Sequence, residues 1–230
     1  MIIKSYELNK IDINKKKLFL LYGHNEGLKN EVTKKYFVDK FKGNIFRYDE
    51  KEVIDNNSDF FDGILSRSFF EEKKLFIISR ATDKLNSIIE EILEKEINDV
   101  AILLNASILD KKSKIRKLFE KNKDIICIPV YEDNTQTLSG MARDFFRINK
   151  ISISQETINL LIDRSRGDRG NLINELNKIE SYIKTHKNIT SEEIIKLTDL
   201  AENYNVSELL DNCLSKNSKK TINILNENNF

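Results

Sequence analysis

Short runs of apolar residues alternate with longer segments of helical periodicity over residues 17–150. The apolar runs are continuous, as expected for strands of a parallel sheet that has helices on both faces. Between these runs, apolar residues recur at intervals of three and four, which indicates amphipathic helices. The predicted strands are residues 18–22, 45–48, 74–79, 100–105 and 124–130, and the predicted helices between them are 28–41, 58–66, 86–95 and 113–121. This order predicts a doubly wound α/β domain of about five strands.

The pattern changes after residue 130, where no further strand is predicted and the chain becomes helical. Helical spacing predicts helices over residues 136–149, 154–166 and 171–184, and a fourth that begins at Thr190. Thr190 and Glu193 form a capping box, and Ile189 and Ile194 are spaced as a hydrophobic staple around it.

The last residues predict two more amphipathic helices, which are too short to bury their apolar faces by themselves. Either they dock on the preceding domains, or they begin a further helical domain, which is the interpretation we favour. We therefore expect an α/β domain over 1–135, a small three-helix lid domain over 136–203, and the beginning of a C-terminal helical domain over 204–230.

Composition restricts the class of protein. With 33% charged and 40% hydrophobic residues, the 230-residue chain has enough apolar material for a core and is neither disordered nor collagen-like. Lys and Arg number 38 against 37 Asp and Glu, so a broadly basic nucleic-acid coat is excluded and any DNA contact must be local or shared with other subunits. The longest apolar runs are far shorter than the about 20 residues of a membrane span, so we expect no membrane segment.

The cysteines and the first residues indicate the compartment. Cys127 and Cys213 are too few for a disulfide framework, and no Cys/His cluster suggests a metal site. The start of the sequence, MIIKSYELNK, has no apolar stretch of the kind found in signal peptides. We expect a cytoplasmic protein without a metal or a cofactor.

A segment that resembles a nucleotide-binding loop follows the first predicted strand, where the P-loop lies in RecA-like and AAA+ folds. A working loop has the pattern G-x-x-x-x-G-K-[ST], whose glycines let the backbone wrap phosphate, whose lysine binds the β- and γ-phosphates, and whose hydroxyl binds Mg²⁺. Here Gly23, Gly27 and Lys29 are present, but Leu28 replaces the second glycine of the pattern and Asn30 replaces the hydroxyl residue. We expect a degenerate loop that does not bind ATP, with Lys29 as a solvated charge.

The other parts of an ATPase site are also weak. The strand over 74–79 continues into Ser79-Arg80-Ala-Thr-Asp83 without the acidic pair that holds Mg²⁺, so phosphoryl transfer would lack its main electrostatic support. Asn105 lies where AAA+ proteins have a polar sensor, but asparagine at a strand end is also a common turn former, and we leave it unassigned. Arg169, near the position of a lid sensor arginine, is interpreted as a loop charge. We find no catalytic residues.

Phe69 and Phe70 are followed at once by four charged residues. Phe61, Leu65 and Phe69 share i, i+4 spacing, so Phe69 could extend a buried helical stripe, whereas Phe70 falls off that stripe. Two interpretations stay open: both rings pack at the end of the helix, or they form an exposed aromatic plug for a partner's pocket, the kind of anchor that dominates interface energetics.

Five segments, taken in order, resemble the delta subunit of bacterial DNA polymerase III, the clamp-loader subunit. They are LFLLYGHNEGLKNE, SRSFFEEKKLFIISRATDKL, AILLNASILDKKSKIRKLFE, RSRGDRGNLINELNKIESY and SELLDNCLSKNSKKTINILNE. The resemblance covers nearly the whole chain, and the family's C-terminal collar domain is missing beyond Phe230. It implies an AAA+-like fold without a functional ATPase site, and binding to a sliding clamp through a hydrophobic pair at the positions of Phe69 and Phe70. The pair is commonly Leu-Phe in the family, so Phe69 departs from the pattern.

The resemblance implies a subunit of the clamp-loader complex that binds and opens the sliding clamp during replication. Its partners would be the clamp (beta subunit), the gamma/tau and delta prime subunits, and DNA through the assembled complex. The chain would not be an enzyme by itself but part of a DNA-directed DNA polymerase holoenzyme, a nucleotidyltransferase, at the cytoplasmic replisome. The alternatives are an ATP-hydrolysing AAA+ subunit and a helical adaptor without a replication function.

Overall fold

The computed structural model describes residues 1–10, 17–66, 73–95, 97, 99–186, 189–198 and 206–227. The chain divides into two compact units, Met1–Glu132 and Asp133–Phe230. Each unit is treated by itself below. The division into three domains stays a prediction.

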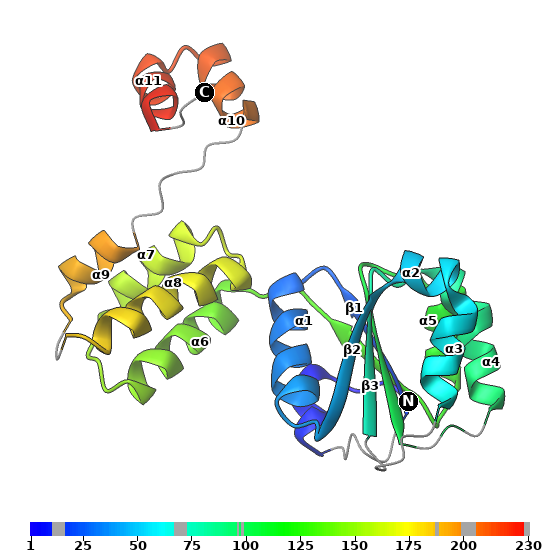
Figure 1. The fold of residues 1–230 in the computed structure, drawn as a ribbon. Helices are drawn as coiled ribbons and strands as arrows, with labels where there is room; N and C mark the ends of the chain where they lie inside the picture. Colours follow the sequence, from blue (N-terminus) through cyan, green and yellow to red (C-terminus); the bar gives the residue numbers. More distant parts are fainter. Residues whose placement is uncertain are drawn as a thin grey trace. The chain divides into compact units, whose positions relative to one another are not determined.

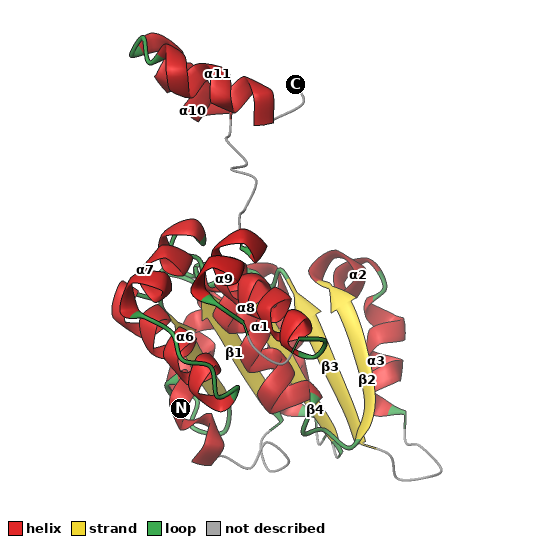
Figure 2. Ribbon diagram, turned by 90° about the vertical axis from the view of Figure 1, so that its left-hand side faces the viewer, coloured by secondary structure: helices red, strands yellow, loops and turns green. Residues whose placement is uncertain are grey.

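A parallel sheet of five strands forms the centre of the first unit, in the order β2-β3-β4-β1-β5 (Figure 2). This architecture confirms the predicted α/β fold class. The strands are β1 (Leu18–Gly23), β2 (Gly43–Asp49), β3 (Lys73–Ser79), β4 (Val100–Ala106) and β5 (Ile126–Val130).

Helices cover both faces of the sheet, with α1 on one face and α3, α4 and α5 on the other (Figure 1). The helices of this unit are η1 (Ser5–Lys10), α1 (Glu26–Val32), which continues as the π-helical η3 (Thr33–Val38), α2 (Glu50–Asp55), α3 (Asn57–Leu65), η4 (Asp83–Leu85), α4 (Asn86–Glu94) and α5 (Lys114–Lys121). The sequence did not predict α2, which begins with a capping box in which Asp49 and Glu52 exchange hydrogen bonds with each other's backbone.

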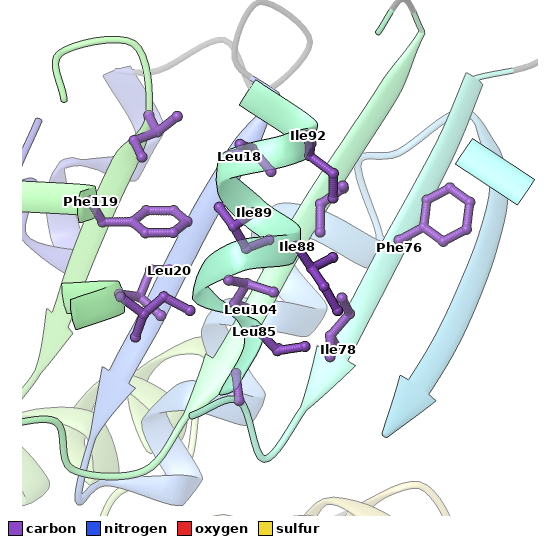
Figure 3. Close-up of a cluster of buried hydrophobic side chains, with 14 of the residues drawn as sticks. Leu18, Leu20, Phe76, Ile78, Leu85, Ile88, Ile89, Ile92, Leu104 and Phe119 are labelled. Atoms are coloured by element: carbon purple, nitrogen blue, oxygen red, sulfur yellow. The ribbon is translucent and has the colours of Figure 1, made fainter. Parts of the chain in front are cut away.

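The central strand β1 supplies side chains to two cores. Leu18 and Leu20 pack with α4 and α5 on one face, and Figure 3 shows them beside Phe119 and the isoleucines of α4. Phe19 and Leu21 point to the other face, toward Phe37 of η3. Each such side chain contributes about 1.5–3 kcal/mol of burial free energy, which explains why a continuous apolar run marks this strand.

The second unit is helical. Its helices are α6 (Thr135–Ile148), α7 (Gln155–Arg164), α8 (Arg169–Ile183), α9 (Ser191–Leu197), α10 (Val206–Leu214) and α11 (Ser218–Glu227). The first four share one core built on Leu138, Phe146 and Leu172. The capping box at Thr190 and Glu193 is present as predicted. Among the described residues, no helix is long and apolar enough to span a membrane.

Candidate functional site

The carboxyl ends of β1 and β4 meet at the point where the sheet order reverses direction, because β1 leads through α1 toward β2 while β4 leads through α5 to β5. In open parallel sheets, ligands bind in the crevice outside the strand ends at such a point. The candidate residues Gly23, Gly27, Lys29 and Asn105 belong to the elements that end or begin here.

The connection from β1 to α1 consists of His24 and Asn25 alone. The Asn25 side chain accepts a hydrogen bond from the Leu28 N–H at 2.9 Å and so caps α1, and its Nδ2 donates to the Tyr131 carbonyl at 3.1 Å. Gly27 is buried in the first turn of the helix. Residues that wrap phosphate as a loop in a nucleotide-binding protein are therefore already helical in this chain.

Gly23 holds the end of β1 close to β5. Its φ is +142°, and a Cβ at this position would lie 1.9 Å from the Val130 carbonyl oxygen. The glycine is thus required by the close approach of two strands, which is a structural role and not a role in cradling phosphate.

Lys29 is buried, so its interpretation as a solvated charge was wrong. The side chain is 4% exposed, and Nζ donates to Glu26 Oε1 at 2.5 Å and to the Ala106 carbonyl at 2.8 Å. The lysine is in register with the P-loop lysine, but its ammonium is held by a carboxylate one turn earlier in the same helix and by the end of β4. The charge that would bind phosphate is neutralised within the chain.

Asn105 belongs to β4, beside this lysine site, and is not a turn residue. Its Nδ2 donates to Thr33 Oγ1 at 3.5 Å, while its buried Oδ1 has no hydrogen-bond partner among the described residues. Its amide therefore connects β4 to the helix that carries Lys29.

Arg80 follows β3 where an ATPase has its magnesium-binding acid, and it adopts a left-handed backbone conformation with φ of 59°. Its Nε donates to Asp49 Oδ2 at 2.5 Å, and this hydrogen bond lowers the pKa of Asp49. The neighbouring Glu50 carboxylate accepts from both the backbone and the hydroxyl of Thr82. The acids at this edge of the sheet thus hold the loop after β3, and the described residues contain no cluster of three metal-ligating side chains.

Arg169 is the first residue of α8, and its interpretation as a loop charge was wrong. It forms a two-pronged ion pair with Asp133, with Nε–Oδ2 at 2.6 Å and Nη2–Oδ1 at 2.7 Å. The arginine side chain is 12% exposed and the aspartate side chain 6%. A fork of this geometry is among the strongest ion pairs in proteins, and here it fixes Asp133, two residues before α6, to the start of α8.

Phe69 and Phe70 lie outside the described residues. In the adjoining helix α3, the buried side chains are Phe60, Phe61 and Ile64, whereas Leu65 is 46% exposed. The buried stripe suggested through Phe61 and Leu65 was therefore wrong at Leu65.

Lys74, near the start of β3, contacts the end of α3. Its Nζ donates to the Gly63 carbonyl at 2.9 Å and to the carbonyl and hydroxyl of Ser66, both at 2.7 Å. The ammonium thereby satisfies carbonyls that a helix end leaves without partners. This contact, which we call the Lys74 clasp, joins the end of α3 to the start of β3.

No protein-family model matches the sequence, and no curated protein matches it. Among solved structures, the DNA clamp loader delta protein of Bacillus subtilis is similar with a TM-score of 0.59 and 18% identity, over 96% of this chain and 69% of that chain. RuvB of Thermotoga maritima, a Holliday junction branch migration motor, is similar with a TM-score of 0.53 and 14% identity, over 93% of this chain and 72% of that one.

Identities this low show the fold alone. That fold is an AAA+-like fold, and it confirms the fold implied by the resemblance in the sequence. A clamp loader delta protein is among the structures that share it, over nearly the full length of this chain.

Proposed function

We propose that this protein is a delta-type clamp-loader subunit that binds a ring-shaped sliding clamp and opens it, without hydrolysing ATP itself. The observation that carries the proposal is the position of Lys29, which Glu26 and Ala106 hold against the sheet in a chain with the fold of a clamp loader delta protein. A subunit of this kind acts through protein contacts, and the near-zero net charge of the chain agrees with such a role.

Clamp contact is proposed for Phe69 and Phe70. Aromatic side chains that enter a partner's pocket supply much of the energy of an interface. The Lys74 clasp supports this role, because a segment whose two ends are held together loses less conformational entropy when it binds.

Ring opening would follow from differential affinity. A ligand shifts an equilibrium only by the difference in its affinity for the two states, so this chain must bind the open clamp more tightly than the closed clamp. Each tenfold preference supplies about 1.4 kcal/mol toward opening. ATP dependence would come from gamma/tau and delta prime partners at the cytoplasmic replisome, with DNA held by the assembled complex.

An ATP-hydrolysing AAA+ subunit is the alternative, since a branch migration motor has a similar fold. Two features favour the proposal over this alternative. The two-residue connection before α1 has no loop that could wrap phosphate, and Arg80 stands where a magnesium-binding acid is needed.

The test is a pull-down on the immobilised cognate sliding clamp. We expect the wild-type protein to bind and Phe69→Ala/Phe70→Ala to lose binding. The matched control is Leu210→Ala/Leu214→Ala, which removes two exposed apolar side chains from α10 and should bind as the wild type does. Full binding by the phenylalanine variant would refute the assignment of the pair, and failure of the wild type to bind would refute the function.

A further inference from the structure

The two edges of the sheet differ. β5 forms one edge, and the first residues of the chain pair with it: the Ile3 N–H donates to the Cys127 carbonyl and the Cys127 N–H donates to the Met1 carbonyl, both at 2.9 Å. β5 also contains Pro129, the single proline of the chain, which has no N–H to donate to a neighbouring strand. This edge is therefore covered from within the chain.

The opposite edge, formed by β2, is open. β2 pairs with β3 over seven consecutive residues, from Gly43 to Asp49, so the strand is regular and contains no bulge. No strand among the described residues pairs with its outer side (Figure 2). The backbone N–H and C=O groups that point away from β3 are a template for a further strand, and a proline or a bulge that would prevent such pairing is missing from β2.

One face of β2 is aromatic. The ring of Phe46 stacks on Phe76 with 5.1 Å between the ring centroids, and Tyr48 stacks on the same ring at 6.1 Å. Phe46 remains 36% exposed, so part of its ring is uncovered at the edge of the sheet. A strand beside β2 would place its own side chains next to Phe46 on this face, where apolar residues fit.

The other face of β2 is basic at the edge. Ile45 marks this face because it packs with the core that contains η3. Arg47 lies on the same face, two residues further along the strand, and so does Lys73, which is paired with Gly43 in the neighbouring strand. Neither cation forms an ion pair with the described residues. Residues 33–48, which lead through η3 into β2, carry five basic residues and one acidic residue, a net charge of +4.

We propose that β2 binds an extended segment of a partner protein, in which acidic residues alternate with apolar residues, as a further strand of the sheet. Alternate side chains of a strand point to opposite faces, so the acidic residues would lie beside Arg47 and Lys73 and the apolar residues beside Phe46. Main-chain hydrogen bonds supply the affinity in this mode of binding, and the alternate side chains supply the specificity. A second copy of this chain does not fit, because antiparallel pairing of two β2 strands brings their two basic faces together. The contact does not depend on clamp binding.

The experiment measures binding of the full chain to a labelled peptide by fluorescence anisotropy. The probe is a peptide as long as β2, in which glutamate and valine alternate. Two control peptides carry N-methyl groups, one on every valine and the other on every glutamate. The N–H groups of alternate residues point to the same edge of a strand, so pairing with β2 uses one set alone. We expect one methylated peptide to lose at least about tenfold in affinity and the other to bind as the parent peptide does.

A protein variant tests the basic face. Arg47→Glu should weaken binding of the parent peptide about fivefold, because attraction to the glutamates becomes repulsion. The matched control is Arg143→Glu, which makes the same change at an exposed position of α6 and should bind as the wild type does. In hydrogen exchange, amides of residues 43–49 should exchange more slowly when the peptide is bound.

Three results would overturn the proposal. Equal binding by both methylated peptides and the parent would show attraction by charge without strand pairing. Equal weakening by Arg47→Glu and Arg143→Glu would show that net charge, and not the face of β2, determines binding. Absence of binding by the wild type, or unchanged exchange of the β2 amides with the peptide bound, would exclude β2 as the site.

Discussion

Replacing Lys29 with methionine is expected to destabilise the α/β unit, because the lysine ammonium is a structural group in this chain. Nζ donates to Glu26 Oε1 and to the carbonyl of Ala106 at the end of β4. Methionine keeps the length of the aliphatic side chain but donates no hydrogen bond. The buried Ala106 carbonyl therefore loses a charged donor, while the packing of the side chain is largely retained.

The expected loss follows from the exposure of the two partners. An acceptor that loses its donor in a buried site costs about 1–3 kcal/mol. The Glu26 side chain is 66% exposed and is solvated by water once the lysine is removed, so loss of the ion pair costs at most about 1 kcal/mol of stability. Removal of a buried ammonium recovers part of its desolvation cost. We expect a net loss of about 1–3 kcal/mol, which corresponds to a fall of roughly 5–10 °C in melting temperature at the middle of this range.

The assay is urea unfolding followed by circular dichroism, with a parallel titration of Mg-ATP. Lys34→Met, which removes an exposed lysine from η3, is the matched control and should change stability by less than about 0.5 kcal/mol. Glu26→Gln should lower the free energy of unfolding by less than Lys29→Met does. A Lys29→Met protein as stable as the wild type would refute the reasoning, and so would ATP binding by the wild type that is lost in this variant.

Two further predictions test the surrounding structure. Gly23→Ala should lower the free energy of unfolding in urea by more than about 3 kcal/mol, because its Cβ would collide with the Val130 carbonyl. The control is Gly140→Ala in α6, where an added Cβ would meet no atom within 4 Å, so this variant should be as stable as the wild type or more stable. Equal stabilities of the two variants would contradict this reasoning. Burial raises the pKa of Asp83, but hydrogen bonds from Ser113 and the α5 backbone outweigh burial, so the net pKa is lower than usual. The carboxylate therefore stabilises the fold above its usual pKa of 3.8, and this stabilisation is lost as the pH falls through the lowered pKa. Urea midpoints measured from pH 7 to below 3 should therefore fall less for Asp83→Asn than for the wild type, and parallel curves would exclude this role.

Strands β1, β3, β4 and β5 could be predicted because each is buried on both faces, whereas β2, at the edge of the sheet, is largely exposed. In β1, Phe19 and Leu20 contribute to opposite cores, so the run has no polar position and differs from the helices that the structure describes. Helix α2 was missed because its residues show no clear apolar periodicity, and Val53 is its fully buried side chain. The capping box at Asp49 and Glu52 was the local signal that could have located it.

The candidate site was harder to predict because its decisive contacts are distant in sequence. Glu26 is visible three residues before Lys29, but the Ala106 carbonyl that completes the lysine site is 77 residues away. Asp133 and Arg169 are separated by 36 residues. Sequence spacing can show that a lysine or arginine occupies the position of a phosphate ligand, but only the tertiary structure shows that its charge is already taken.

Lys29 and Arg169, the two residues whose interpretation was wrong, are both cations that are already paired within the chain. Lys29 is in register with the P-loop lysine of AAA+ proteins, and Arg169 lies near the position of their lid sensor arginine. Each is buried against a carboxylate of its own unit, Glu26 and Asp133. Removing one member of a buried pair leaves an uncompensated charge, so the Arg169–Asp133 pair, with side chains 12% and 6% exposed, resists replacement by an external anion. The cap and the lysine at the start of α1 are satisfied from within the chain. Under the proposed function, any ATP dependence of the contacts of this chain would therefore come from neighbouring subunits.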